Sequence, residues 1–155
     1  MKAMRLTQGT TISDPALSGL IERAKGAAHV ASLVFPFEPV PASRPRVTRW
    51  GVFYAKTYRT WKQLAEKHCA PGTLNMTKTT PLFVVVESIF TKARTSKLTF
   101  PTPDVDNTAK GPLDVITKAS GYWHDDKQVT WLVTGKRFAV KGEDARTEIH
   151  IYTLP

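Results

Sequence analysis

The chain has 155 residues, of which 22 are Lys or Arg and 13 are Asp or Glu, so it carries a formal net charge of +9. This length indicates one domain with a real core, and the positive charge favours nucleic acid or another polyanion as partner. No apolar run approaches the roughly 20 residues of a membrane span. A single cysteine, Cys69, excludes an internal disulfide and a cysteine-based zinc site. Because an apolar signal-peptide region is also lacking, we expect a cytoplasmic protein.

The N-terminal part of the chain has the pattern of a helical extension followed by a strand. Asp14-Pro15 is typical of a helix start, and apolar residues then recur at helical spacing through about Ala28. We therefore expect residues 1–29 to form an extension with a short helix, and residues 30–155 to form the main domain. A first strand is predicted over Val30–Phe37.

Four prolines between residues 36 and 45 predict a loop without regular structure. Arg44, Arg46 and Arg49 lie within and just after this loop, close to aromatic residues. Arginines next to aromatic rings suit contact with the phosphates and bases of DNA. A solvated loop over a small aromatic cluster is the open alternative. The apolar spacing that follows predicts a helix over Lys56–Cys69.

The most apolar run, Leu82–Phe90, is rich in β-branched residues and predicts a central strand buried on both faces. The segment from Thr91 to Thr102 contains no acidic residue and three basic ones, Lys92, Arg94 and Lys97. A loop that grips DNA and an ordinary flexible loop explain this composition equally well. Two further strands are predicted over Gln128–Val140 and Thr147–Thr153, paired as a hairpin.

These elements predict an α+β fold. We expect a single domain with a mixed β-sheet and two main helices, plus the extra N-terminal helix.

The acidic residues are concentrated in one part of this basic chain. Five of the 13 fall between residues 104 and 126, namely Asp104, Asp106, Asp114, Asp125 and Asp126. A compact acidic centre in a basic protein is the pattern expected of a metal-dependent enzyme that acts on a polyanion. For a single arbitrary sequence the commoner explanation is that such aspartates are turn and cap residues or a solvated loop. The clustering makes that explanation weaker here.

The local geometry supports a shared site. Pro103 implies an extended approach, in which Asp104 and Asp106 lie on the same side of the chain. A helix that starts at Asp106 or Asn107 places Asp106, Lys110 and Asp114 on one face. Pro112 then predicts an irregular or bent first turn. Asp104, Asp106 and one of the pair Asp125-Asp126 suit Mg²⁺, which prefers carboxylate oxygens, and Lys110 is a positive charge beside them.

These residues carry a resemblance to a known family. The segment Pro103-Asp-Val-Asp-Asn-Thr-Ala-Lys110, followed by Asp114, the aromatic run Gly121-Tyr-Trp123 and the segment Asp125-Asp-Lys-Gln-Val129, resembles the RusA family of Holliday-junction resolvases. The resemblance extends roughly from Val30 to Thr153. It implies a homodimeric endodeoxyribonuclease that requires Mg²⁺, with Mn²⁺ as a substitute, and that cuts four-way DNA junctions symmetrically in recombination and repair.

The same resemblance assigns roles to residues. It implies that Asp104, Asp106 and Asp126 match the essential acidic residues of the family, that Lys110 matches its catalytic lysine, and that Asp114 matches a recurrent acidic position. An extra residue near Ser120 keeps Asp125 as an alternative to Asp126, which is the closer match. A short member of this family would often be encoded by a phage or prophage.

Two other functions stay open at this stage. A basic DNA-binding module without catalysis would explain the charge, the arginines and the aromatic residues, but not the gathering of aspartates. A metal nuclease that acts on other branched DNA or on RNA would share the same residues, and only substrate competition separates it from a junction resolvase.

Overall fold

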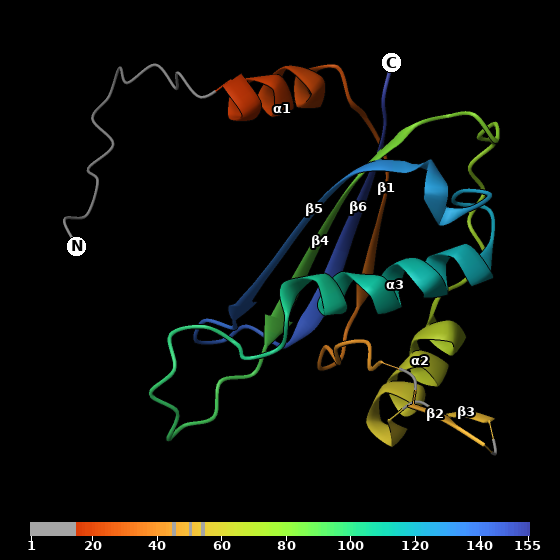
Figure 1. The fold of residues 1–155 in the computed structure, drawn as a ribbon. Helices are drawn as coiled ribbons and strands as arrows, with labels where there is room; N and C mark the ends of the chain where they lie inside the picture. The colour runs from red at the N-terminus through yellow and green to blue at the C-terminus, as the bar shows by residue number, and fades with distance from the viewer. Residues whose placement is uncertain (1–14, 45, 50, 54) are drawn as a thin grey trace, which may run out of the picture.

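The computed structural model describes residues 15–44, 46–49, 51–53 and 55–155. Within these ranges the chain forms three α-helices, one short 3-10 helix and six strands (Figure 1). In order they are α1 (Pro15–Lys25), β1 (Ala28–Phe35), β2 (Arg46–Thr48), β3 (Gly51–Phe53), α2 (Lys56–His68), β4 (Leu82–Phe90), α3 (Val105–Ala119), η1 (Asp126–Gln128), β5 (Val129–Phe138) and β6 (Arg146–Thr153). The predicted α+β class with a mixed sheet is confirmed. Ser13 and Asp14 of the predicted helix start lie outside the described residues.

The main sheet has four strands in the order β1-β6-β4-β5. Strand β6 is antiparallel to both of its neighbours, whereas β4 and β5 are parallel. The hairpin that we predicted between the last two strands is therefore wrong, because β6 crosses the end of β4 and inserts between β4 and β1. Strands β2 and β3 form a separate two-stranded hairpin.

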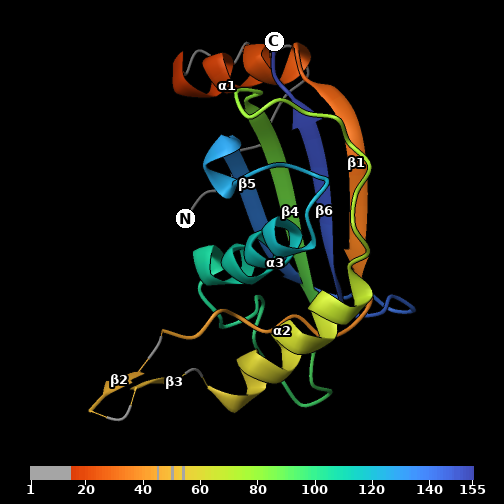
Figure 2. The same cartoon turned by 90° about the vertical axis from the view of Figure 1, so that its right-hand side faces the viewer.

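Helices α2 and α3 cover one face of the sheet (Figures 1 and 2). Their apolar sides pack on strand residues to form the core, which includes Trp61, Val84, Ile116 and Ile149. In the part of the chain that the structure describes, no helix covers most of the opposite face (Figures 1 and 2). Strand β4 accordingly alternates between buried residues such as Val84 and half-buried residues such as Val85. The prediction that this strand is buried on both faces is wrong, although its bounds and its central position are right.

Helix α3 begins one or two residues earlier than predicted, with Asp104 at the N-cap position. It is continuously helical from Val105 to Ala119 with Pro112 inside, so of the irregular or bent first turn that we expected, an irregular turn is not found. Proline lacks the N–H that would bond to the carbonyl one turn back. Here its buried ring lies on the side of the helix that faces the core.

The end of α3 is fixed by a close crossing of two loops. Ser120 and Gly121 have φ angles of 63° and 78°, which end the helix. The Gly72 N–H donates to the Ser120 carbonyl at 2.9 Å, and the Leu74 N–H donates to the Gly121 carbonyl at 2.8 Å. A Cβ atom on Gly121 would lie 2.0 Å from the Gly72 carbonyl oxygen. Only glycine permits this approach, which locks the segment after α2 against the segment before η1.

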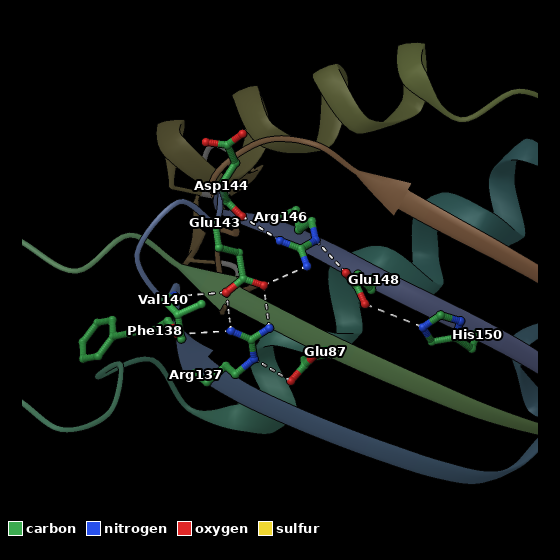
Figure 3. Close-up of polar contacts among 9 residues, drawn as sticks. All are labelled: Glu87, Arg137, Phe138, Val140, Glu143, Asp144, Arg146, Glu148 and His150. Atoms are coloured by element: carbon green, nitrogen blue, oxygen red, sulfur yellow. Dashed lines mark hydrogen bonds and ion pairs between the residues drawn. The ribbon is translucent and has the colours of Figure 1, made fainter.

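An ion-pair network ties three strands together on the helix-free face (Figure 3). Arg137 of β5 donates to Glu87 of β4 at 3.0 Å and to Glu143 at 2.6 and 2.7 Å. Arg146 of β6 donates to Glu143 at 2.9 Å and to Glu148 at 2.6 Å. These hydrogen bonds, first of all those from Arg137, hold the pKa of Glu143 well below its ordinary value of 4.5. The network fastens the loop between β5 and β6 to the sheet.

Helix α1 contacts the sheet through a cation–π pair. The Arg23 guanidinium lies 4.8 Å from the centre of a Trp131 ring on β5. Among the described residues, no helix is long and apolar enough to cross a membrane.

We predict that replacing Gly121 by Ala destabilises the fold more than replacing Gly142 by Ala. Both glycines have a positive φ, but Gly142 has open space around it. Gly142→Ala should therefore cost only the backbone strain, about 1–2 kcal/mol. Gly121→Ala adds the clash with Gly72 and should cost about 3 kcal/mol or more. Denaturant unfolding of both variants measures this, and equal losses would show that the crossing does not matter.

We predict that Glu143→Gln lowers the free energy of unfolding most at neutral pH. A carboxylate whose pKa is depressed in the folded state stabilises the fold above its unfolded pKa, and this contribution fades as the pH falls below that value. The difference between wild type and variant should therefore shrink below pH 4.5, the ordinary pKa of the group. Unfolding experiments across this range provide the measurement.

Glu22→Gln is the matched control for that prediction. Glu22 pairs with Lys25, but both side chains are about two-thirds exposed or more, so the pair should contribute little at any pH. A deficit of Glu143→Gln that did not change with pH would contradict the role given to the network.

Candidate active site

Two exposed carboxylates stand at the start of α3. Asp104 occupies the N-cap position, yet its side chain makes no capping hydrogen bond. Asp106 lies in the first turn, and both residues are exposed. Neither side chain has a hydrogen-bond or ion-pair partner among the described residues. Capping and turn formation therefore do not account for these two aspartates.

Strand β5 holds the start of α3 in place. The Lys136 ammonium donates a hydrogen bond to the Pro103 carbonyl. The Thr134 hydroxyl donates one of 3.4 Å to the Val105 carbonyl. The main chain that carries Asp104 is thus fixed to the sheet on both sides of the residue. Because the backbone is tied down, the two carboxylates have a defined position relative to the core.

Asp106, Lys110 and Asp114 lie at successive turns along one face of α3, as the sequence predicted. Lys110 follows Asp106 by one turn and is exposed, and Asp114 follows Lys110 by another turn and is half-buried. The Asp114 carboxylate lies 3.9 Å from the Lys62 ammonium of α2. Lys110 and Asp114 both line a hollow of about 300 Å³ between α3, α2 and the loop before β2.

The Asp125-Asp126 pair divides into a structural and an exposed residue. The Asp125 carboxylate accepts a hydrogen bond of 3.0 Å from the Lys127 N–H, and the Gln128 side chain completes a capping box. The Lys127 N–H is also the main reason why the pKa of Asp125 is lowered. Asp126 is exposed. The capping role of Asp125 leaves Asp126 as the better candidate for a functional site.

Asp126 and the start of α3 lie at opposite ends of that helix. Helix α3 has 15 residues, about 22 Å at 1.5 Å per residue. Helix η1 lies beyond the C-terminal end of α3 and contacts the loop at Thr77 and Thr80, whereas Asp104 lies beyond the N-terminal end (Figure 1). Consistently, the described residues contain no group of three or more His, Cys, Asp or Glu side chains that could hold a metal ion. One chain brings Asp104 and Asp106 together, but not Asp126 with them.

The predicted basic residues fall into two groups. Lys92, Arg94 and Lys97 are exposed on the segment between β4 and α3, with the Lys92 ammonium 5.5 Å from the centre of the Phe138 ring. This segment leads directly into the start of α3 (Figure 1). Arg44 lines the hollow beside α3.

Arg49 is exposed between β2 and β3, on a hairpin that projects away from the sheet (Figure 2). The main chain of Arg46 begins β2, while its side chain lies outside the described atoms.

Lys62 is the residue near this site that the sequence did not single out. In the sequence it is one of several basic residues on the polar side of α2, with Lys56, Arg59 and Lys67. Only the packing of α2 beside α3 shows that it borders the same hollow as Lys110.

A comparison with protein-family models identifies the family of this chain. The family model described as Endodeoxyribonuclease RusA matches residues 36–152. The chain belongs to the RusA endodeoxyribonuclease family. A comparison with curated proteins found no match.

The RusA match covers every element from β2 to β6 except the last residue of β6, so it includes α3 and η1. It confirms the resemblance that the acidic segments carried. The protein is an endodeoxyribonuclease of the class that resolves Holliday junctions in recombination. Helix α1 and the whole of β1 lie before the matched region.

Proposed function

We propose that this RusA-family protein is a Mg²⁺-dependent endonuclease that resolves four-way DNA junctions by paired symmetric nicks. The observation that carries the proposal is the pair of exposed carboxylates, Asp104 and Asp106, which have no partner among the described residues. Carboxylates that serve neither a cap nor an ion pair are available to ligands. In this proposal residues 30–155 form the nuclease domain and residues 1–29 an extension to it.

The donor set at the start of α3 fits a hard divalent cation. Mg²⁺ is typically held by one or two carboxylates, with water and substrate phosphate completing its shell, and Asp104 and Asp106 supply such a pair. Mn²⁺, which also prefers oxygen ligands, should substitute. When bound, the ion supplies Lewis-acid stabilisation of the phosphate and lowers the pKa of bound water.

The protein residues position the phosphate for this chemistry. Lys110 lies one helical turn after Asp106 on the same face and is exposed. Its ammonium is placed to hold a non-bridging oxygen of the scissile phosphate and to offset the charge that develops there. Water adds to phosphorus and the 3′ oxygen leaves, which yields a 5′-phosphate and a 3′-hydroxyl.

The position of Asp126 supports a homodimer. Within one chain Asp126 lies about a helix length from Asp106, so it cannot join the same metal site. In a two-fold dimer with antiparallel α3 helices, Asp126 of the second copy would lie near the start of α3. Two sites related by symmetry would then cut two strands, as paired nicking requires.

The edge of the sheet beside α3 suits such an interface. Strand β5 is the last strand of the sheet, and no described strand pairs with its outer side. Such edges are templates for further strand pairing. The apolar side chains of Leu132 and Val105 are 41% and 37% exposed at this edge. Antiparallel pairing of two β5 strands would place the beginning of one strand, next to η1, beside the end of the other.

We also propose that the basic residues already described contact the arms of the junction. Three of them, Lys92, Arg94 and Lys97, lie on the segment that enters the start of α3. The other three are Arg44, Arg46 and Arg49. Contacts of this kind neutralise phosphates and make binding sensitive to salt.

We predict that Asp104→Asn and Asp106→Asn abolish cleavage but preserve, or even tighten, junction binding. Asparagine keeps the size of the side chain and removes the charge that holds the cation and repels phosphate. Wild type and variants should be incubated with a labelled four-way junction and a matching linear duplex, with Mg²⁺, Mn²⁺ or EDTA. Paired nicks in the junction alone, dependent on metal and lost in both variants, are the expected result.

The other outcomes of that assay each identify a different function. Junction binding without nicks under any metal would favour a DNA-binding module without catalysis. Stronger competition by flap or RNA substrates than by the junction would favour a nuclease of other specificity. Loss of binding together with loss of cleavage in a folded variant would contradict the metal-ligand role.

We predict that Asp106→Asn and Asp126→Asn, each inactive alone, recover nicking when the two variants are mixed and allowed to exchange subunits. In a shared site the mixed dimer keeps one intact pair, Asp106 from one copy and Asp126 from the other. If each site came from a single chain, every site in the mixture would carry a lesion and no activity would return. The assay counts single nicks in a labelled junction.

A further inference from the structure

The hollow between α2 and α3 has an excess of positive charge that the acidic centre does not explain. Its volume is about 300 Å³. Among the described residues, three cationic residues line it, Arg44, Lys62 and Lys110, together with Asn107 and one acidic residue, Asp114. Three cations against one anion in a concave surface favour an anionic ligand.

The walls of the hollow are held by specific packing. Gly111 of α3 lies directly against α2, where a Cβ atom would be 3.0 Å from the Trp61 ring and 3.2 Å from the Tyr58 ring. The absence of a side chain at Gly111 therefore lets the two helices approach closely. The Ala42 N–H donates to the Asn107 carbonyl at 2.8 Å, which fastens the third wall to the first turn of α3. The cations are thus presented on a rigid frame.

The charge of Lys62 is only weakly neutralised. Its ammonium lies 3.9 Å from the Asp114 carboxylate, beyond hydrogen-bond distance, and both side chains are about one-third exposed. Such pairs contribute little and are easily exchanged for another partner. A second pair between the same helices, Lys118 and Glu66, is by contrast a direct hydrogen bond of 2.6 Å.

We propose that this hollow binds a backbone phosphate of the DNA next to the cut, and that Lys62 is a phosphate-binding residue. Lys110 belongs both to the hollow and to the helix face of Asp106, so a phosphate held here lies within one or two nucleotides of the metal site. Arg44 and the Asn107 amide supply further donors to its oxygens. The inference rests on the proposed cutting site at the start of α3.

Asp114 acts on the hollow through its ion pair with Lys62. It keeps Lys62 over the hollow while no DNA is bound and competes with phosphate for the same ammonium group. Asp114→Asn should therefore leave junction binding in EDTA unchanged or tighter.

The test is the salt dependence of junction binding in EDTA, where no strand is cut. The slope of log K against log salt reports the number of phosphates that the protein neutralises. Lys62→Gln should lower that slope by about one, and Lys62→Arg, which keeps the charge, should restore it. Lys118→Gln is the matched control, because it removes a lysine from the same helix interface, and its slope should equal that of wild type.

Two results would overturn the inference. One is a slope for Lys62→Gln equal to that of wild type. The other is an equal change in Lys62→Gln and Lys118→Gln with matching losses in melting temperature, which would assign Lys62 to helix packing alone. Because binding in EDTA does not depend on catalysis, a failure of this test is distinct from a failure of the nuclease proposal, which would show as binding without nicks in Mg²⁺ or Mn²⁺.

Discussion

The parallel pairing of β4 and β5 determines where the candidate acidic residues lie. Two parallel strands that follow each other in sequence need a connection that runs back to the end of the sheet at which the first strand began. A helix usually provides this connection. Here α3 is that connection, so its first turn lies where β4 ends and its last turn lies where β5 begins. Asp104 and Asp106 are consequently held near the ends at which β4 and β5 finish, and Asp126 near the ends at which they begin. The separation of the acidic residues is a consequence of strand direction rather than of local sequence.

Helix α2 lies close enough to α3 to form one wall of the hollow that Lys110 lines because Gly111 of α3 has no side chain. Gly111 faces the rings of Trp61 and Tyr58, where an added Cβ atom would lie 3.0 and 3.2 Å from ring atoms, so even a methyl group there would crowd the helix contact. The close approach places a basic side of α2 next to the acidic and amide groups of α3. Attraction of DNA phosphates and coordination of a cation need opposite charges within a short distance, and this helix pair supplies both.

Features that depend on local periodicity could be predicted from the sequence. The apolar stripe of Tyr58, Trp61 and Ala65 gave the bounds of α2 to within one residue, and the β-branched run gave those of β4. Strand neighbours could not be predicted in this way, because the alternation in β6 is the same whether it pairs with β5 or inserts between β1 and β4. The acidic motif located Asp104 and Asp106, but no spacing rule shows that Asp126 lies a helix length away. Lys62 was missed for a similar reason, since its role depends on what packs beside it.

The pairing of β1 with β6 has a consequence for synthesis on the ribosome. Ala28 and Thr153, which are register partners, are 125 residues apart. Because β6 lies between β1 and β4, β1 has no strand partner, and β4 has only β5, until almost the whole domain has emerged. Folds dominated by such distant pairings form slowly, and incomplete chains leave strand edges open to aggregation. A nascent chain that ends before β6 already contains the acidic motif of α3, but it lacks the completed sheet against which α3 packs. The nuclease fold can therefore form only after β6 has been translated.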